Sequence, residues 1–278
     1  MQRGDGVGRM RFNVAAGRDG GRITRLAEVH QRYPIRVLLP HPGQGEPPTA
    51  VVITTSGGLA GGDRIRLEVA ADAGAVAAVT SQAAEKVYRS LGPDARVDAV
   101  LTAGAGAWLE WLPQETILFD GARLARSTAL AVEAGGQLLA VESIVFGRIA
   151  RGEAFTRGRL AEDWRITIGG RLAWADALRL DEPLAPVFAA AAGLAGARAL
   201  ATLVLVGADA PAARDLVRAV AESFPSVRIG ATAIGSIAIA RFLGSDPQVL
   251  RTALAAAVGT LRASAAGLPN RAPRIWYG

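Results

Sequence analysis

The sequence predicts a mainly β protein with a stacked-sheet, β-helix or solenoid-like body and two α-helices in its C-terminal third. Short apolar or alternating segments, typical of strands, fill the first two thirds of the chain. A strand, a small-residue turn with glycine and a second strand recur at a spacing of about 30 residues. Helical spacing of apolar residues begins only beyond residue 181.

The predicted strands open on three short segments. RIRLEVA (64–70) alternates apolar and charged residues, which is typical of a strand with one buried face. PIRVLLP (34–40) and AVVITT (50–55) are apolar runs bounded by turn formers. Each of these segments therefore predicts a strand.

The repeat is the strongest indication of a layered architecture. It comprises residues 64–82, 96–114 and 126–144, with turn glycines Gly74, Gly106 and Gly136. Glycine suits such turns because they need a positive φ or close backbone approach. Stacked units of this kind bury a continuous core between neighbours. A fourth pair over 163–180 predicts a tight hairpin at Gly169–Gly170.

The composition and the spacing of apolar residues change near residue 181. We therefore expect a β-rich body over 1–180 and a C-terminal α/β portion over 181–278, packed on it as one structural unit. A Pro/Ala/Gly-rich connection comes first, and the elements expected after it are a strand at 199–207, a helix at 211–224, a hairpin at 228–244 and a helix at 245–264. Ser245 or Asp246 is expected to cap the last helix, with Pro247 in its first turn.

Composition excludes several classes of site. The chain has 278 residues, a formal net charge of +6 and no cysteine, so disulfides and thiolate metal sites are excluded. Its arginines are scattered rather than clustered, which argues against a nucleic-acid partner. The apolar run at 199–208 is too short to cross a bilayer, and the N-terminus has no apolar leader segment. The expectation is a soluble, cytoplasmic protein without a membrane or nucleic-acid partner.

The segment GGLAGGD (57–63) resembles a phosphate-binding loop but lacks its context. A P-loop ends in Gly-Lys-Ser/Thr and leads into a helix. Here Asp63 and Arg64 follow the last glycine, and a strand comes next. A carboxylate at that position would also repel phosphate. We interpret the segment as a tight corner in which Asp63 accepts hydrogen bonds from nearby backbone amides.

Metal and acid–base chemistry have few candidates. His30 and His41 are isolated, and we expect both on the surface. The remaining oxygen ligands are carboxylates: Asp63, Glu110, Glu115, Asp120, Glu142, Glu153 and Asp176. Glu142 is the clearest anomaly, because a carboxylate in an apolar strand costs free energy unless it is paired. Either an arginine such as Arg148 pairs with it, or it has a functional role.

The enzyme interpretation depends on one carboxylate pair. Glu110 and Glu115 could act as the two acids of a solenoid-type carbohydrate-active enzyme. The low aromatic content, 5%, and the missing nucleophile elbow argue against it. The residues therefore favour a binding or scaffold protein that is not an enzyme, with the carbohydrate enzyme kept as the alternative.

Several segments then resemble a known family. In order they are SGGLAGGDRIRLEV, EKVYRS, AWLEWLPQETILFDGAR, FGRIARGEAFTRGRL and APRIW. Together they resemble the urease accessory protein UreD family, called UreH in some bacteria, from about residue 20 to the C-terminus. The most specific piece is LEWLPQETILFDGA.

The resemblance implies an all-β, helix-like stack of strands with two α-helices, in a protein that is not itself an enzyme. It implies that the chain binds UreF directly, binds the GTPase UreG through that complex, and contacts apo-urease. The implied task is GTP-dependent assembly of the urease nickel centre, with an internal passage that carries nickel. No tightly bound cofactor is expected, only transient nickel.

The resemblance also implies site residues. Asp63, Glu142 and Asp176 match acidic positions of the family motifs, which makes them candidates for a weak nickel path. Glu115 and Arg148 are supporting candidates, as a motif acid and a paired charge. Carboxylates suit such a path because strong nitrogen and sulfur ligands would trap the metal. A structural role for each residue stays open at this point.

Overall fold

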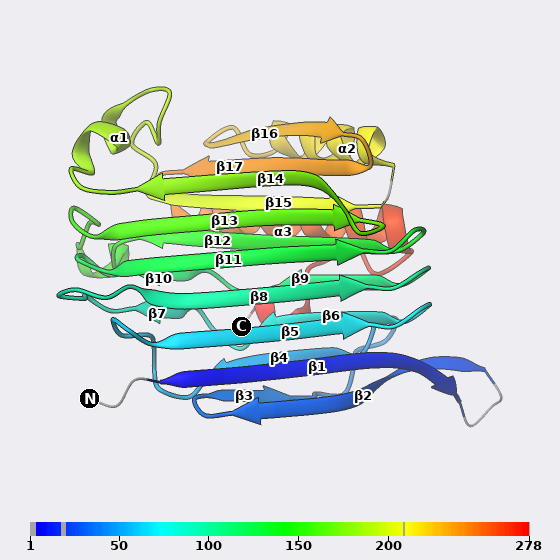
Figure 1. Ribbon diagram of the computed structural model, residues 1–278. Coiled ribbons are helices and arrows are strands. Elements are labelled where there is room, and N and C mark those ends of the chain that lie inside the picture. Colours follow the sequence, from blue (N-terminus) through cyan, green and yellow to red (C-terminus); the bar gives the residue numbers. More distant parts are fainter. Residues whose placement is uncertain (1–3, 18–20, 208, 278) are drawn as a thin grey trace.

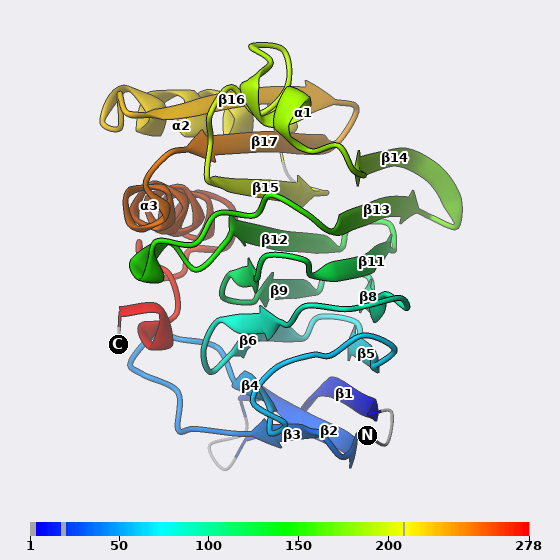
Figure 2. The ribbon, with the colours of Figure 1, turned by 90° about the vertical axis from the view of Figure 1, so that its left-hand side faces the viewer.

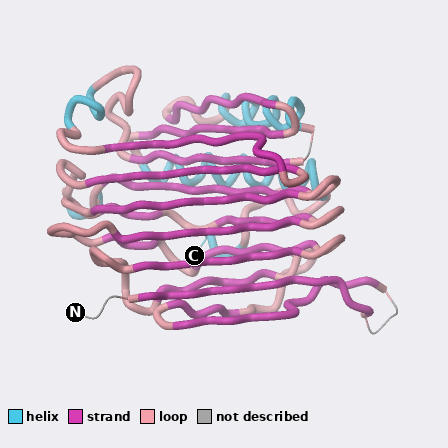
Figure 3. The backbone as a smooth tube through the Cα atoms, viewed as in Figure 1, coloured by secondary structure: helices cyan, strands magenta, loops and turns pink. Residues whose placement is uncertain are grey.

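Two facing β-sheets form the body of the molecule. The computed structural model describes residues 4–17, 21–207 and 209–277. Figure 1 views the sheets face on, and Figure 2 turns them edge on, so that the two layers separate and the helices lie outside one of them. Figure 3 shows the strands running side by side, with loops gathered at their two ends. The mainly β, stacked architecture is confirmed.

We call the layer without long helices sheet A. Its strands lie in the order β14, β13, β11, β8, β5, β1 and β2. In that order they span Arg171–Leu180, Arg159–Ile168, Arg123–Val132, Ala95–Ala103, Arg64–Ala71, Asp5–Ala16 and Arg22–Arg32. From β1 to β13 neighbouring strands run parallel, and the two edge strands β2 and β14 are antiparallel.

Sheet B is the layer that the helices cover. Its main order is β16, β17, β15, β12, β9, β6, β4 and β3. These strands span Val227–Ile234, Ile237–Gly244, Ala199–Val206, Gln137–Phe146, Trp108–Leu112, Val76–Ser81, Thr49–Thr54 and Ile35–Leu38. Two short strands lie beside this path: β10 (Thr116–Leu118) pairs with β12 and with β7 (Glu85–Val87). The strands after residue 181 thus continue the sheet that the earlier strands begin.

Each predicted repeat is one coil of the stack. Its first strand lies in sheet A and its second in sheet B, as in β5 and β6, β8 and β9, and β11 and β12. Gly74 and Gly106 adopt positive φ at the first two turns, as expected. In the third turn Gly135 takes the positive φ. Gly136 is needed for close approach, because a Cβ there would lie 2.5 Å from the carbonyl oxygen of Gly104.

The N-terminal strands β1 and β2 were not individually predicted. Phe12 and Met10 of β1 face the core, but Gly6 and Gly8 occupy the preceding inward positions and hide the apolar alternation. A Cβ on Gly6 would lie 2.7 Å from Cδ1 of Ile65. Neighbouring large side chains therefore fill the space that an apolar residue of β1 would occupy.

Helices cover the outer face of sheet B. They are α2 (Ala210–Glu222) and α3 (Pro247–Ala266), which match the two predicted helices. Asp246 caps α3 by accepting hydrogen bonds from the Gln248 and Val249 amides. The short helix α1 (Ala185–Ala189) lies in the segment expected to be a plain connection. Among the described residues, no helix is long and apolar enough to cross a membrane.

Apolar packing separates two cores. The larger one fills the space between the sheets and includes Phe12, Leu101, Phe146 and Trp164. The second lies between sheet B and the helices and includes Trp108 and Leu254. Polar groups between the sheets therefore lie in an apolar environment, where each must be paired to offset its desolvation.

Candidate functional site

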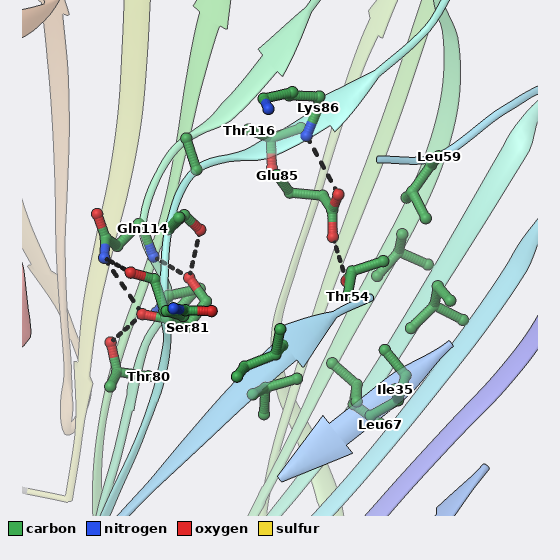
Figure 4. Close-up of a pocket in the computed structure, with 18 of the residues that line it drawn as sticks. Ile35, Thr54, Leu59, Leu67, Thr80, Ser81, Glu85, Lys86, Gln114 and Thr116 are labelled. Atoms are coloured by element: carbon green, nitrogen blue, oxygen red, sulfur yellow. Dashed lines mark hydrogen bonds between the residues drawn. The ribbon is translucent and has the colours of Figure 1, made fainter. Parts of the chain in front are cut away.

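A cavity of about 210 Å³ lies between the two sheets. Leu67 of β5, Ile35 of β3 and Leu59 contribute apolar wall (Figure 4). Ile65 of β5 also lines the cavity. The rim is polar, and its side chains include those of Thr54, Ser81, Glu85, Gln114 and Thr116. The cavity is thus an apolar chamber with oxygen-bearing side chains around one side.

Glu85 is the carboxylate at the rim. It accepts hydrogen bonds from the Thr54 hydroxyl and, at 3.1 Å, from the Lys86 amide (Figure 4). Burial raises the pKa of Glu85, although those hydrogen bonds oppose the rise. Across the rim, the Ser81 hydroxyl accepts a hydrogen bond from the backbone N–H of Gln114 at 2.9 Å. Neutral and acidic oxygens therefore converge where the cavity is most polar.

The inner end of the cavity carries a buried group that we call the Arg126 cluster: Arg126, Glu142 and Glu162. Arg126 and Glu162 are directly paired on β11 and β13 of sheet A, and Glu142 faces them from β12 of sheet B. Nη1 of Arg126 lies 2.7 Å from Oε2 of Glu142, and Nη2 is bonded to Oε1 of Glu162. Each of the three side chains is about 95% buried.

Further donors hold Glu142 in place. Trp111 Nε1 donates to its Oε1 at 3.0 Å, and the Thr128 hydroxyl donates to the same oxygen at 3.3 Å. Burial raises the pKa of Glu142, and the attraction of Arg126 only partly offsets this. Two carboxyl groups thus share one guanidinium beside the cavity.

A second polar group continues from Glu142 across sheet B. Glu142 is paired with Thr202 on β15, and Thr202 is paired with Arg241 on β17. Directly paired residues point to the same face, so this row faces sheet A. Arg241 donates to the Thr202 hydroxyl and to Oδ2 of Asp176, which extends from β14 of sheet A. Asp176 and Arg241 are each 34% exposed.

We call the whole set the interior polar seam: Arg126, Thr128, Glu142, Glu162, Asp176, Thr202 and Arg241. Sheet A contributes the row Thr128, Trp164 and Asp176. Adjacent strands are about 4.8 Å apart, so the backbones of Glu142 and Arg241 are separated by roughly 10 Å. The seam therefore brings Glu142 and Asp176, two of the predicted path residues, into one inter-sheet layer.

Asp63 lies elsewhere. Its Oδ1 accepts a hydrogen bond from the Gly4 amide and its Oδ2 one from the Ala60 amide, both at 2.8 Å. Asp63 does not line the cavity. The corner is thus as the sequence suggested, a turn in which the carboxylate binds backbone amides, and it also fixes the start of β1 beside β5.

The two supporting residues lie outside the cavity lining. Glu115 pairs with Arg251 of α3, with 2.8 Å between Oε2 and Nη1. Arg148 pairs with Glu153 and lies over the Phe119 ring. The pairing suggested for Glu142 with Arg148 is therefore wrong: Arg126, on the facing strand, takes that place because its side chain points into the sandwich.

Glu110, from the alternative enzyme interpretation, belongs to what we call the Arg262 cluster: Arg262, Glu110 and Glu46. Glu110 is fully buried beneath α3, where Arg262 Nε donates to its Oε1 at 2.8 Å. Nη2 of the same arginine is 2.5 Å from Oε2 of Glu46. Burial raises the pKa of Glu110, against the attraction of Arg262. Glu110 therefore faces a helix rather than a groove that a sugar could enter.

Sequence reasoning missed the arginines and Glu162 of the seam. The signal was present, because the strand RLARSTALAV alternates and puts Arg126 on the same face as Leu124 and Leu130. Strand pairing, which a single sequence does not reveal, decides which acid faces it. Within the described ranges, no group of three or more His, Cys, Asp or Glu side chains could hold a metal ion. The seam consequently offers scattered oxygen ligands.

The sequence matches known proteins over most of its length. The family model described as "UreD urease accessory protein" matches residues 6–277. A protein of Azorhizobium caulinodans named urease accessory protein UreD is 42% identical over 270 residues, covering 97% of this chain and 96% of its own length. A protein of the same name from Magnetococcus marinus is 42% identical over 257 residues, covering 91% of this chain and 89% of its own. The expected resemblance is confirmed, and the chain belongs to the UreD family of urease accessory proteins.

Proposed function

We propose that this protein is a nickel-delivery scaffold in GTP-dependent assembly of the urease nickel centre. In this proposal it works in the cytoplasm, binds UreF directly, binds UreG through the UreD–UreF–UreG complex, and contacts apo-urease. It performs no catalysis of its own, and nickel is its transient cargo. Membership of the UreD accessory family supports the task.

One observation carries the passage part of the proposal. Arg126 and Glu142 line the cavity between the sheets, and both belong to the interior polar seam. From there the seam reaches Asp176 at a partly exposed edge. Hydroxyls and carboxylates thus follow one another from the cavity to that edge, within an otherwise apolar sandwich, and would offer oxygen ligands to a divalent cation.

The ligand chemistry fits a cargo better than a resident metal. Oxygen ligands bind divalent first-row ions less tightly than imidazole or thiolate ligands, so they release them more readily. Glu142 with the Thr128 hydroxyl, and Asp176 with the Thr202 hydroxyl, are the pairs that would exchange with the ion's water. Asp63 lies at the corner outside the cavity, so in this proposal its contribution is to the chain path rather than to nickel contact.

Co-expression tests the scaffold part. The tagged chain is expected to capture UreF in a pull-down and to recover UreG only when UreF is present. Apo-urease expressed with UreF and UreG but without this chain should remain inactive. Failure to capture UreF, or full urease activation without the chain, would contradict the proposal.

The carbohydrate-enzyme alternative finds no such support. Glu110 is buried under α3 and bonded to Arg262, while Glu115 is bonded to Arg251. A retaining or inverting pair needs both carboxyl groups to reach one sugar ring. The geometry around these two residues does not provide that, so we propose no reaction for them.

A further inference from the structure

We infer that Arg126 and Arg241 are the resident counter-ions of the passage: each holds a carboxylate until a passing divalent cation takes its place. This inference rests on the proposed function and adds to it the residues that keep the cation from being trapped. The same arrangement occurs at two places: the Arg126 cluster beside the cavity and the Arg241–Asp176 pair at the partly exposed edge.

Arg126 contacts the oxygen atoms that would otherwise bind a nickel ion. Its Nη1 is 2.7 Å from Oε2 of Glu142 and donates to the Thr116 hydroxyl at 3.0 Å. Its Nε donates to Glu162 at 2.9 Å. Arg126, Glu142 and Thr116 all line the cavity. A cation that reaches the inner end of the cavity therefore meets a carboxylate that the guanidinium already occupies.

An arginine in this position affects both the stability of the empty protein and its affinity for a cation. Without it, two buried carboxylates would lie close together in an apolar layer and destabilise the empty protein. With a divalent cation bound, the same two carboxylates would hold it tightly, because Coulomb attraction is strong in a medium of low permittivity. A guanidinium has no lone pair and cannot bind a metal. It can only compete for the carboxylate, which lowers the affinity for the cation.

The pair of Arg241 and Asp176 has the same arrangement, an arginine bound to a carboxylate. Arg241 donates both to Asp176 and to the Thr202 hydroxyl. It lies in the same row of sheet B as Glu142, with Thr202 between them. Because Arg241 and Asp176 are partly exposed, solvent can take over the guanidinium when the pair opens. A cation leaving Glu142 thus meets a second carboxylate that is again held by an arginine.

The test measures how long the protein keeps nickel. The full-length chain, purified with the partners that co-purify with it, is loaded with NiCl₂, desalted and challenged with a chelator. R126Q should lose nickel on the order of tenfold more slowly than the unaltered protein, because a repulsive charge close to the ion has been removed. R126K keeps the charge and should stay near the unaltered rate. R9Q is the matched control, since Arg9 pairs with Glu68 at 2.9 Å on the outer face of sheet A.

A charge-compensated variant separates charge from structure. R126Q leaves two carboxylates without a cation, whereas R126Q/E162Q returns the local net charge to its original value. The double variant should therefore recover fast nickel release. If R126Q released nickel as fast as the unaltered protein, or if the double variant were as slow as R126Q, the counter-ion role would be overturned.

Two further variants keep the test decisive. If R126Q does not fold, R241Q carries the same expectation from the partly exposed edge, and fast release from R241Q would overturn the inference. E142Q distinguishes this inference from the proposed function. Normal urease activation by E142Q, with the UreF complex intact, would contradict the passage itself. Impaired activation by E142Q together with fast release from R126Q would contradict only the role of the arginines.

Discussion

Two buried clusters in this molecule are built from the same residue types but have different surroundings. In the Arg126 cluster and in the Arg262 cluster, one guanidinium lies between two glutamates. The Arg126 cluster joins the two sheets and lies beside the cavity. The Arg262 cluster joins α3 to sheet B and to the loop before β4, and neither Arg262 nor Glu110 lines that cavity.

The two clusters also connect different parts of the chain. Arg262 links segments 152 and 216 residues away along the chain. It also donates to the carbonyl oxygen of Arg271, which ties down the C-terminal tail. Such a cluster holds distant segments together. The Arg126 cluster makes its contacts within the sandwich: Arg126 and Glu162 lie on backbone-paired strands, and Glu142 meets them from the facing sheet.

The largest expected effect comes from breaking the Arg262 cluster. R262A leaves Glu110 buried without a counter-charge and should lower the free energy of unfolding by about 3–5 kcal/mol. Urea denaturation of the purified chain measures this. The control is R214A, because Arg214 pairs with its neighbour Asp215 on the surface of α2, and it should leave the midpoint unchanged. An unchanged midpoint for R262A would mean that the cluster does not hold α3 in place.

The next effect concerns the corner at Asp63. D63A removes both backbone hydrogen bonds that its carboxylate accepts, which should cost about 1–3 kcal/mol of stability. Nickel retention in the chelator assay should not change, since Asp63 lies outside the cavity. Reduced nickel retention without a loss of stability would instead assign Asp63 to the metal path.

A smaller effect is a pH dependence from Glu110. Burial raises its pKa in the folded protein, so the folded state holds its proton to a higher pH than the unfolded chain does. The contribution of Glu110 to stability therefore falls as the pH rises above the unfolded value of about 4.3. The unaltered protein should lose stability relative to E110Q as the pH rises above that value. A relative gain over that range, measured by denaturation midpoints, would show that Arg262 outweighs the desolvation.

The smallest effect is expected at Arg148. R148Q removes an exposed contact with Glu153, and solvent screens such pairs. Neither the denaturation midpoint nor nickel retention should change measurably. A clear loss of nickel binding in R148Q would extend the functional region from the seam to the loop after β12.

Periodicity predicted most of the fold because the repeats are regular. The alternation in RIRLEVA and the turn glycines of the repeats place β5, β8 and their partners correctly. The strand β1 escaped individual prediction because Gly6 and Gly8 occupy inward positions, which neighbouring side chains fill. The pattern of residues within one strand does not reveal that a side chain from a neighbouring strand fills an inward position.

The candidate site was predictable only in part. Glu142 stood out because a carboxylate in an apolar strand demands a partner, and it is indeed buried and paired. Its partner was predicted wrongly. Arg126 and Glu142 lie on facing sheets, and a single sequence does not show which residues of two facing sheets meet. Asp63 and Asp176 came from family resemblance, and of these only Asp176 joins the layer of Glu142.

The central claim is that the interior polar seam carries nickel to urease. The most direct test is the nickel content of urease purified from cells that express each variant with UreF and UreG. E142Q and D176N should lower nickel occupancy while the UreF complex still forms, whereas E68Q, on the outer face of sheet A, should not. Full occupancy with both seam variants would contradict the claim.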